Sequence, residues 1–282
     1  MKKLSLAIAV AATLGAGVAN AYEVAVPGSG LLVPNVIHNG ATDTTAVGLT
    51  NHTAAAITVY WTFFDQDSNH ITDGQFDMTA NDMEGFVWAN EAGLGLEGQR
   101  GYLVFHVGTA TGAPVYARAI SGAAFQADAA ASDAAFVPTF PLQDGNVLGS
   151  DLTNLGPDSL VAVTNAPVTD DVIAMRYQMD SDFSTNIALW ATGGLAASTT
   201  VNMFNDEQQR KSVNFTCEFD ELCFIDPTTI AGRPVDFTNG FITYAVPDVE
   251  GVEQSAVSYS VITSQSFGAA QTLLNTHVAT AD

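Results

Sequence analysis

The chain has 282 residues, with 30 Asp or Glu against 8 Lys or Arg, so its formal net charge at pH 7 is −22. Binding to nucleic acid or to anionic lipid headgroups needs clustered Lys and Arg, and this composition excludes both kinds of partner. Such a chain attracts cations and stays in solution through self-repulsion, as acidic secreted proteins do.

The N-terminus predicts a cleaved signal peptide over residues 1–21. Lys2 and Lys3 precede a largely apolar stretch, and an Ala-Asn-Ala motif of the kind signal peptidases cut ends at Ala21. We therefore expect a mature chain that starts at Tyr22 and is periplasmic, on the cell surface or extracellular. No later apolar run reaches 18 residues, so we expect no membrane span in the mature chain.

The pattern after the signal predicts an all-β fold. Residues 57–63 alternate between larger apolar side chains on one face and Thr or Tyr on the other, which is the period of a strand. Turn-forming clusters recur about every 8 to 12 residues, a spacing typical of antiparallel sandwiches. Two Ala-rich stretches, residues 123–135 and 268–277, are the places where short helices are expected.

Length and internal similarity predict two tandem Ig-like or jelly-roll-like β-sandwich domains, at residues 22–140 and 146–282. Three segments recur in the same order: 57–64 is similar to 172–179, 101–107 to 240–246, and 120–125 to 262–267. The growing offset predicts that the second copy is a duplicate with an insertion of about 25 residues around its cysteines. If the similarities are coincidental, one large sandwich remains.

The two cysteines, Cys217 and Cys223, predict a structural disulfide, because nearby cysteines in an exported chain usually pair. A zinc site would need additional ligands, and no histidine is close in sequence.

One turn follows part of the spacing of a calcium-binding loop. The candidate ligands are oxygen-bearing side chains: Asp65, Asp67, Asn69 and Asp73. His70 stands where that loop needs glycine, and Phe76 stands where it needs a bidentate glutamate. We therefore expect a hairpin turn, keep calcium as the alternative, and expect no other cofactor.

Catalytic motifs are missing from the sequence. It contains no His-Glu-x-x-His, no Gly-x-Ser-x-Gly and no phosphate loop, so we assign no catalytic residue. Trp61 lies on the alternating strand and is expected in the core. Trp88 and Trp190 lie near turns and are candidate sugar-stacking residues.

These observations predict an exported, non-catalytic surface, matrix or periplasmic protein that acts by binding or self-assembly. Its partner would be a protein, either another copy or a surface component, or a glycan. The alternative is a secreted carbohydrate-binding module or glycan-active enzyme, which would show a groove lined by exposed tryptophan and two facing carboxylates.

Overall fold

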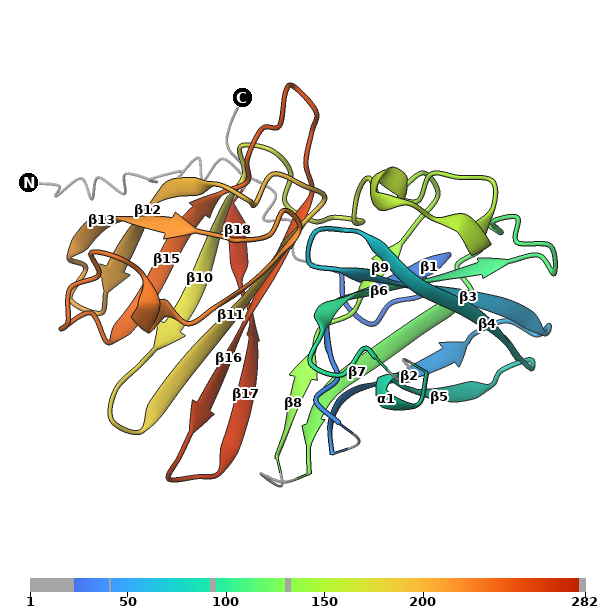
Figure 1. The fold of residues 1–282 in the computed structure, drawn as a ribbon, viewed down its shortest axis with the longest axis horizontal. Helices are drawn as coiled ribbons and strands as arrows, with labels where there is room; N and C mark the ends of the chain where they lie inside the picture. Colours follow the sequence, from blue (N-terminus) through green and yellow to red (C-terminus); the bar gives the residue numbers. More distant parts are fainter. Residues whose placement is uncertain (1–22, 41, 92–94, 130–132, 279–282) are drawn as a thin grey trace, which may run out of the picture.

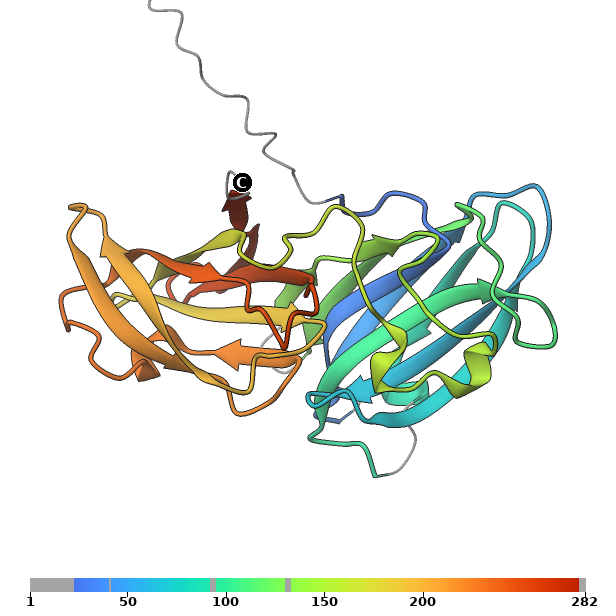
Figure 2. The same ribbon diagram turned by 90° about the horizontal axis from the view of Figure 1, so that it is seen from above.

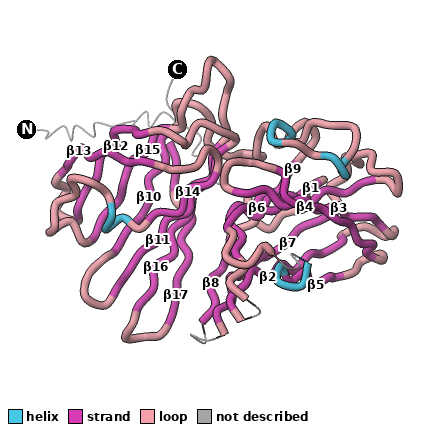
Figure 3. Tube along the Cα trace, in the orientation of Figure 1, coloured by secondary structure: helices cyan, strands magenta, loops and turns pink. Residues whose placement is uncertain are grey.

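The computed structural model describes residues 23–40, 42–91, 95–129 and 133–278, and the predicted cleavage site at Ala21 and Tyr22 lies outside them. In this part of the chain, strands form four antiparallel sheets that make two sandwich-like halves (Figure 1). The all-β prediction is confirmed. Helical structure in the same residues consists of short turns (Figure 3): α1 (Trp88–Glu91), η1 (Leu152–Asn154), η2 (Pro157–Ser159) and η3 (Pro227–Thr229). No helix of the described residues is long and apolar enough to cross a membrane.

The first half contains the strands β1 (Gly30–Ile37), β2 (Asp43–Asn51), β3 (Ile57–Asp65), β4 (His70–Met78), β5 (Met83–Val87), β6 (Arg100–Gly108), β7 (Ile120–Asp128), β8 (Asp133–Val137) and β9 (Phe140–Leu142). One sheet has the order β4-β3-β6-β1-β9 and the other the order β5-β2-β7-β8. Side chains from both sheets fill the space between them, with Trp61 and Trp88 in edge-to-face contact at 5.9 Å between ring centroids.

The second half contains the strands β10 (Val172–Gln178), β11 (Phe183–Ala191), β12 (Ser198–Asn205), β13 (Arg210–Thr216), β14 (Leu222–Ile225), β15 (Asn239–Ala245), β16 (Ala256–Ser264), β17 (Ala269–Leu274) and β18 (Thr276–Val278). Its sheets have the orders β13-β12-β15-β10-β18 and β14-β11-β16-β17. Every strand of the first half thus has a counterpart nine strands later, in the same place of the same kind of sheet.

The strand-by-strand correspondence corrects two details of the repeat inferred from sequence. Residues 57–64 form β3, whereas residues 172–179 contain β10, which occupies the place of β1. Connecting segments also have similar lengths in the two halves: residues 79–82 lead to β5 and residues 217–221 lead to its counterpart β14. The predicted insertion around the cysteines is therefore wrong. Similar strand composition produced the false match, because any two half-buried strands share Val, Ile, Tyr and Thr.

The β3–β4 hairpin of the first half corresponds to the β12–β13 hairpin of the second half. Asp65 Oδ1 accepts a hydrogen bond from Asn69 N at 2.9 Å, and Asn205 Oδ1 accepts one from Gln209 N at 2.8 Å. The residue before each donor has a positive φ, 63° at Ser68 and 64° at Gln208.

A glycine is required next to each of these hairpins. A Cβ added to Gly101 would collide with the carbonyl oxygen of Phe64, and one added to Gly240 would collide with the carbonyl oxygen of Phe204. The similarity of residues 101–107 to 240–246 therefore has a structural basis, since both segments begin at this close approach of backbones.

Residues 143–171 connect the halves and do not belong to the second sandwich, which corrects the boundary expected at residue 146. This segment crosses the outer face of the first half's five-stranded sheet (Figure 2), where Leu152, Leu155 and Leu160 are buried in one cluster with Phe64 and Tyr102. The covering segment explains why β3 is buried on both faces although its sequence alternates.

The described residues of the two Ala-rich stretches form strands and turns, so the expectation of short helices there is wrong. They contribute β7, β8 and β17, and β8 lies beside β17 where the halves meet (Figure 1). Thr272 Oγ1 donates to the carbonyl oxygen of Phe136 at 2.6 Å across this contact. Small side chains let the two strands approach, and that tertiary packing overrides the helix propensity of alanine.

Candidate functional site

The turn proposed as a calcium loop serves as a structural hairpin with protein partners. Asp65 Oδ1 accepts hydrogen bonds from the backbone N–H groups of Asp67 and Asn69, both at 2.9 Å. Asp67 Oδ1 accepts one from Asp220 N of the second half at 3.1 Å. Asp73 lies 3.6 Å from His70 Nε2. Among the described residues, no group of three or more His, Cys, Asp or Glu side chains is arranged to hold a metal ion.

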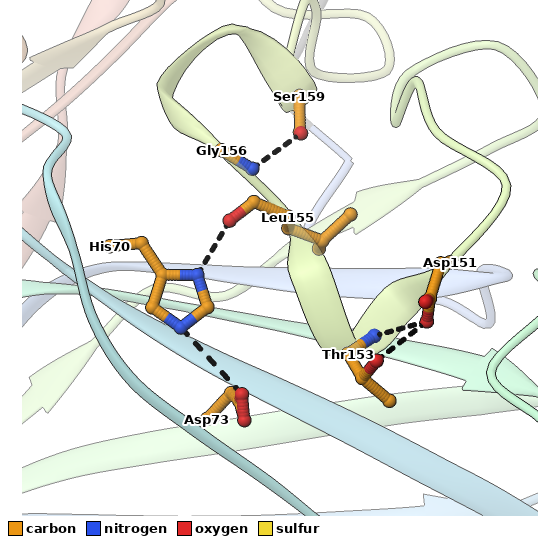
Figure 4. Close-up of polar contacts among 7 residues, drawn as sticks. All are labelled: His70, Asp73, Asp151, Thr153, Leu155, Gly156 and Ser159. Carbon is orange, nitrogen blue, oxygen red and sulfur yellow. Dashed lines mark hydrogen bonds and ion pairs between the residues drawn. The ribbon is translucent and has the colours of Figure 1, made fainter.

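His70 fastens the connecting segment to β4 (Figure 4). Its Nδ1 lies 2.6 Å from the carbonyl oxygen of Leu155, so Nδ1 carries the hydrogen. In the segment itself, the Asp151 carboxylate accepts from Thr153 N at 3.0 Å, and Gly156 N donates to Ser159 Oγ at 2.8 Å. The imidazole thus faces a carbonyl and a carboxylate and contacts no nucleophilic hydroxyl of the described residues, an arrangement that stabilises the fold.

The sugar-stacking prediction for Trp88 and Trp190 is wrong, because both side chains are fully buried. Trp88 lies in the core of the first half, against Phe63 at 4.4 Å between ring centroids. Trp190 lies at the junction of the halves, in edge-to-face contact with Tyr102 at 5.5 Å. A position near a turn in sequence did not mean exposure, because the core of the first half buries Trp88 and the junction of the halves buries Trp190.

The predicted disulfide is confirmed, with Cys217 and Cys223 joined at a Cα–Cα distance of 5.6 Å. It indicates an oxidising compartment outside the cytoplasm. The ring that it closes docks on the β3–β4 hairpin of the first half. Backbone N–H groups of Glu221 and Leu222 both donate to the carbonyl oxygen of Gln66 at 3.1 Å, and Gln66 Nε2 donates back to the carbonyl oxygen of Leu222 at 3.1 Å.

A buried acid lies in this ring. Glu221 is 5% exposed, and its Oε2 accepts a hydrogen bond from the Tyr102 hydroxyl at 2.7 Å. Burial raises the pKa of Glu221 to about 7, while hydrogen bonds from Tyr102 and Ser68 oppose that rise. Burial also raises the pKa of Tyr102 well above its usual value, so the phenol stays protonated and donates. Sequence reasoning missed this acid because nothing in residues 217–223 indicates which carboxylate another part of the chain will cover.

A second polar contact holds the junction. The Arg100 guanidinium lies 3.8 Å from the centre of the Phe224 ring and donates to Asn35 Oδ1 at 2.6 Å. Asn35 Nδ2 in turn donates to the Tyr259 hydroxyl at 3.0 Å. This part of the junction therefore contains one cation–π contact and a short hydrogen-bonded chain.

The second half exposes the face whose counterpart is buried in the first. Phe204 and Phe241 pair across β12 and β15 and stack at 4.8 Å with an interplanar angle of 13°, as Phe64 and Tyr102 do at 5.1 Å and 16°. Phe241 is 38% exposed, whereas Tyr102 is fully buried. Beside Phe241 lies an open groove of about 410 Å³ lined by Ala174, Arg176, Phe241, Leu273, Leu274, Asn275 and Thr276. The sequence carried a signal for this site, the matching Gly101 and Gly240, but did not reveal its exposure.

Comparison with known proteins adds no assignment. No family model matches the chain, and no curated protein matches it. Solved structures that are similar include forms of oxalate decarboxylase from Bacillus subtilis, among them a variant with a substituted tryptophan and the enzyme at pH 4.6. These align at 7–8% identity over 88% of this chain and 68% of theirs, with TM-scores of 0.22 and 0.21. Similarity at that level carries no argument about this protein.

Proposed function

We propose that this is an exported, non-catalytic surface, matrix or periplasmic protein that acts by binding or self-assembly. The observation that carries the proposal is the stack of half-buried Phe204 and exposed Phe241, because its counterpart in the first half is covered by other parts of the chain. A partly exposed aromatic pair on a sheet face is a feature of interaction surfaces.

Export rests on the predicted signal peptide and is supported by the disulfide, which forms outside the cytoplasm. The protein is proposed to be periplasmic, on the cell surface or extracellular. N-terminal sequencing of the exported chain tests it, with Tyr22-Glu-Val as the expected start and a retained Met1 as the contrary result.

We also propose that the two halves descend from one duplicated unit. The shared strand order, the paired hairpins at Asp65 and Asn205 and the paired glycines support this origin. Duplication has a functional consequence. Each half carries an outer face on its five-stranded sheet and an outer face on its four-stranded sheet. The contact between the halves uses the first kind of face from the first half and the second kind from the second half.

One observation supports the alternative of a carbohydrate-binding module or glycan-active enzyme. Phe267, which is 79% exposed, lines an open hollow of about 380 Å³ together with Phe183, Arg176 and Gln178. An aromatic ring beside polar groups can bind a sugar. The two proposals are separated by a glycan-array screen and a reducing-sugar release assay, set beside analytical ultracentrifugation of the mature protein in about 0.15 M NaCl, near physiological ionic strength. Self-association without glycan binding or turnover supports the first proposal, whereas glycan binding or turnover by a monomer contradicts it.

A further inference from the structure

We propose that copies of this chain join head to tail, with the exposed face of the second half around Phe204 and Phe241 binding the outer face of the four-stranded sheet of the next copy's first half. This contact would repeat, between chains, the sheet-to-sheet part of the junction that the two halves make within one chain, without the covering segment 143–171. The inference rests on the proposed function and specifies its partner.

The junction between the two halves of one chain consists of two faces, which we call the receiving face and the inserting face. On the receiving side, Phe64 and Tyr102 stack on the outer face of the first half's five-stranded sheet. On the inserting side, Trp190 and Leu222 pair across β11 and β14 on the outer face of the second half's four-stranded sheet. All four side chains are buried in one apolar cluster, so the two faces fit each other.

The second half has an equivalent receiving face that the described part of the chain leaves open. Phe204 and Phe241 occupy the register of Phe64 and Tyr102, and Phe241 is 38% exposed. Arg210 pairs with Phe204 on β13, and Arg176 pairs with Phe241 on β10, so two cationic side chains flank the stack on its own face. These are two of only 8 Lys and Arg in the chain, and they share the edge of this face with Asp206 of the β12–β13 turn.

The first half has an equivalent inserting face that the described residues also leave open. Thr50 and Met83 pair across β2 and β5 as Trp190 and Leu222 pair across β11 and β14. Met83 is 73% exposed, and on the same outer face Phe125 is 45% exposed. The central part of this face is formed by small uncharged residues, since Gly48, Ala123 and Gly85 lie opposite one another in register. An uncharged, partly apolar sheet face is unusual on so acidic a protein and marks an interaction site.

Position and charge both favour a second copy as the occupant. Figure 1 shows β12 and β13 at the left end of the molecule and β5 in its right half, so the two free faces belong to opposite halves of the molecule. Asp82 takes the place of Glu221 beside the inserting strand and would approach Arg176 and Arg210. The faces are different, so the contact is heterologous and can propagate into an open chain of molecules or close into a ring.

The test uses two variants that each disable one face of the mature protein. Phe241→Asp places a charge on the receiving face, and Met83→Asp places one on the inserting face. We expect wild type to form a concentration-dependent series of oligomers in about 0.15 M NaCl. Each variant alone should weaken self-association about tenfold or more, because a charge would be buried at the centre of the contact. Val235→Asp, at a position that is 86% exposed in the segment before β15, is the matched control and should behave as wild type.

Mixing the two variants decides the geometry. Met83→Asp keeps its receiving face and Phe241→Asp keeps its inserting face, so an equimolar mixture should form dimers and no larger species. Arg210→Glu is a second receiving-face variant at an exposed position, and it guards against a folding defect of Phe241→Asp. A mixture that stays monomeric, or oligomers unchanged by every variant, overturns the head-to-tail contact. If the oligomers form but are unchanged by every variant, the proposed function of self-assembly still holds and only the head-to-tail contact is wrong. A wild type that is monomeric at all concentrations overturns the head-to-tail contact, and glycan binding or turnover by that monomer overturns the proposed function as well.

Discussion

Tyr102 of the first half donates a hydrogen bond to Glu221 of the second half at 2.7 Å, and both side chains are buried. The carboxylate is one of 30 acidic side chains in the sequence, yet its pKa is raised to about 7 because the junction removes it from water. The contact between the halves is therefore tied to the protonation of one group.

Glu221 should make stability depend on pH between about 4.5 and 7. Its folded pKa lies above the value of 4.5 that it has in water, so the folded state binds the proton more tightly than the unfolded state. The contribution is fully present below the unfolded pKa and is lost as pH rises through the folded pKa, by on the order of 3 kcal/mol. Glu221→Gln should remove this loss and be more stable than wild type at about pH 8, above the folded pKa.

The measurement is urea unfolding of wild type and Glu221→Gln at about pH 5 and about pH 8, which bracket the folded pKa. Glu253→Gln, at an exposed position, is the matched control. A difference between wild type and Glu221→Gln that is the same at both pH values would show that Glu221 does not carry a proton in the junction.

Loss of the disulfide should weaken the junction more than the first half. Replacing Cys217 and Cys223 by Ser removes a ring of short sequence separation, for which loop closure predicts a cost of about 2 kcal/mol. Because that ring binds Gln66, limited proteolysis of the double variant should cut residues 217–223 faster and leave the first half intact. Mass spectrometry of unreduced wild-type peptides should show the linked pair, and freely alkylated thiols would contradict it.

The paired glycines should respond alike to substitution. Gly101→Ala and Gly240→Ala each force a methyl group against the carbonyl oxygen of an aromatic residue on the neighbouring strand. We expect each to lower the free energy of unfolding by about 1–3 kcal/mol. Gly85→Ala, where an added Cβ meets nothing within 4 Å, should leave stability nearly unchanged. A harmless change at only one of the two positions would contradict the equivalence of the hairpins.

Tryptophan fluorescence should report a shielded environment. Trp61, Trp88 and Trp190 are 6%, 0% and 0% exposed, and they are all the tryptophans of the chain. Iodide should quench the native protein much less than the protein in urea, and added oligosaccharides should leave the emission unchanged. Strong native quenching, or a saturable change with a sugar, would mean that one of the rings is accessible after all.

Salt should stabilise the fold and promote association. The formal charge of −22 produces repulsion that screening reduces, since the Debye length falls from ~30 Å at 0.01 M to ~10 Å at 0.1 M salt. We expect the melting temperature and the weight-average mass to rise with NaCl. CaCl₂ and MgCl₂ at equal ionic strength should act alike, because Asp65 and Asp67 already bind backbone N–H groups. A specific effect of calcium, lost in Asp65→Asn, would restore the calcium-loop hypothesis.

The sequence by itself determined the class of fold, the disulfide and the electrostatic character. Alternation over residues 57–63 predicts a strand, because successive side chains of an extended chain point to opposite faces. Pairing of Cys217 with Cys223 follows from their proximity in a chain that carries a predicted export signal. These properties depend on short segments or on overall composition, and neither requires knowledge of contacts between distant parts of the chain.

Only the tertiary structure decided which faces are covered, and therefore which residues can act. Tyr102 and Phe241 occupy equivalent positions on similar strands, but the connecting segment and the second half bury the first and leave the second exposed. Trp190 and Glu221 are buried for the same reason, by contact with residues far away in the chain. Burial depends on what packs against a face, and strand periodicity states only that a strand has two faces.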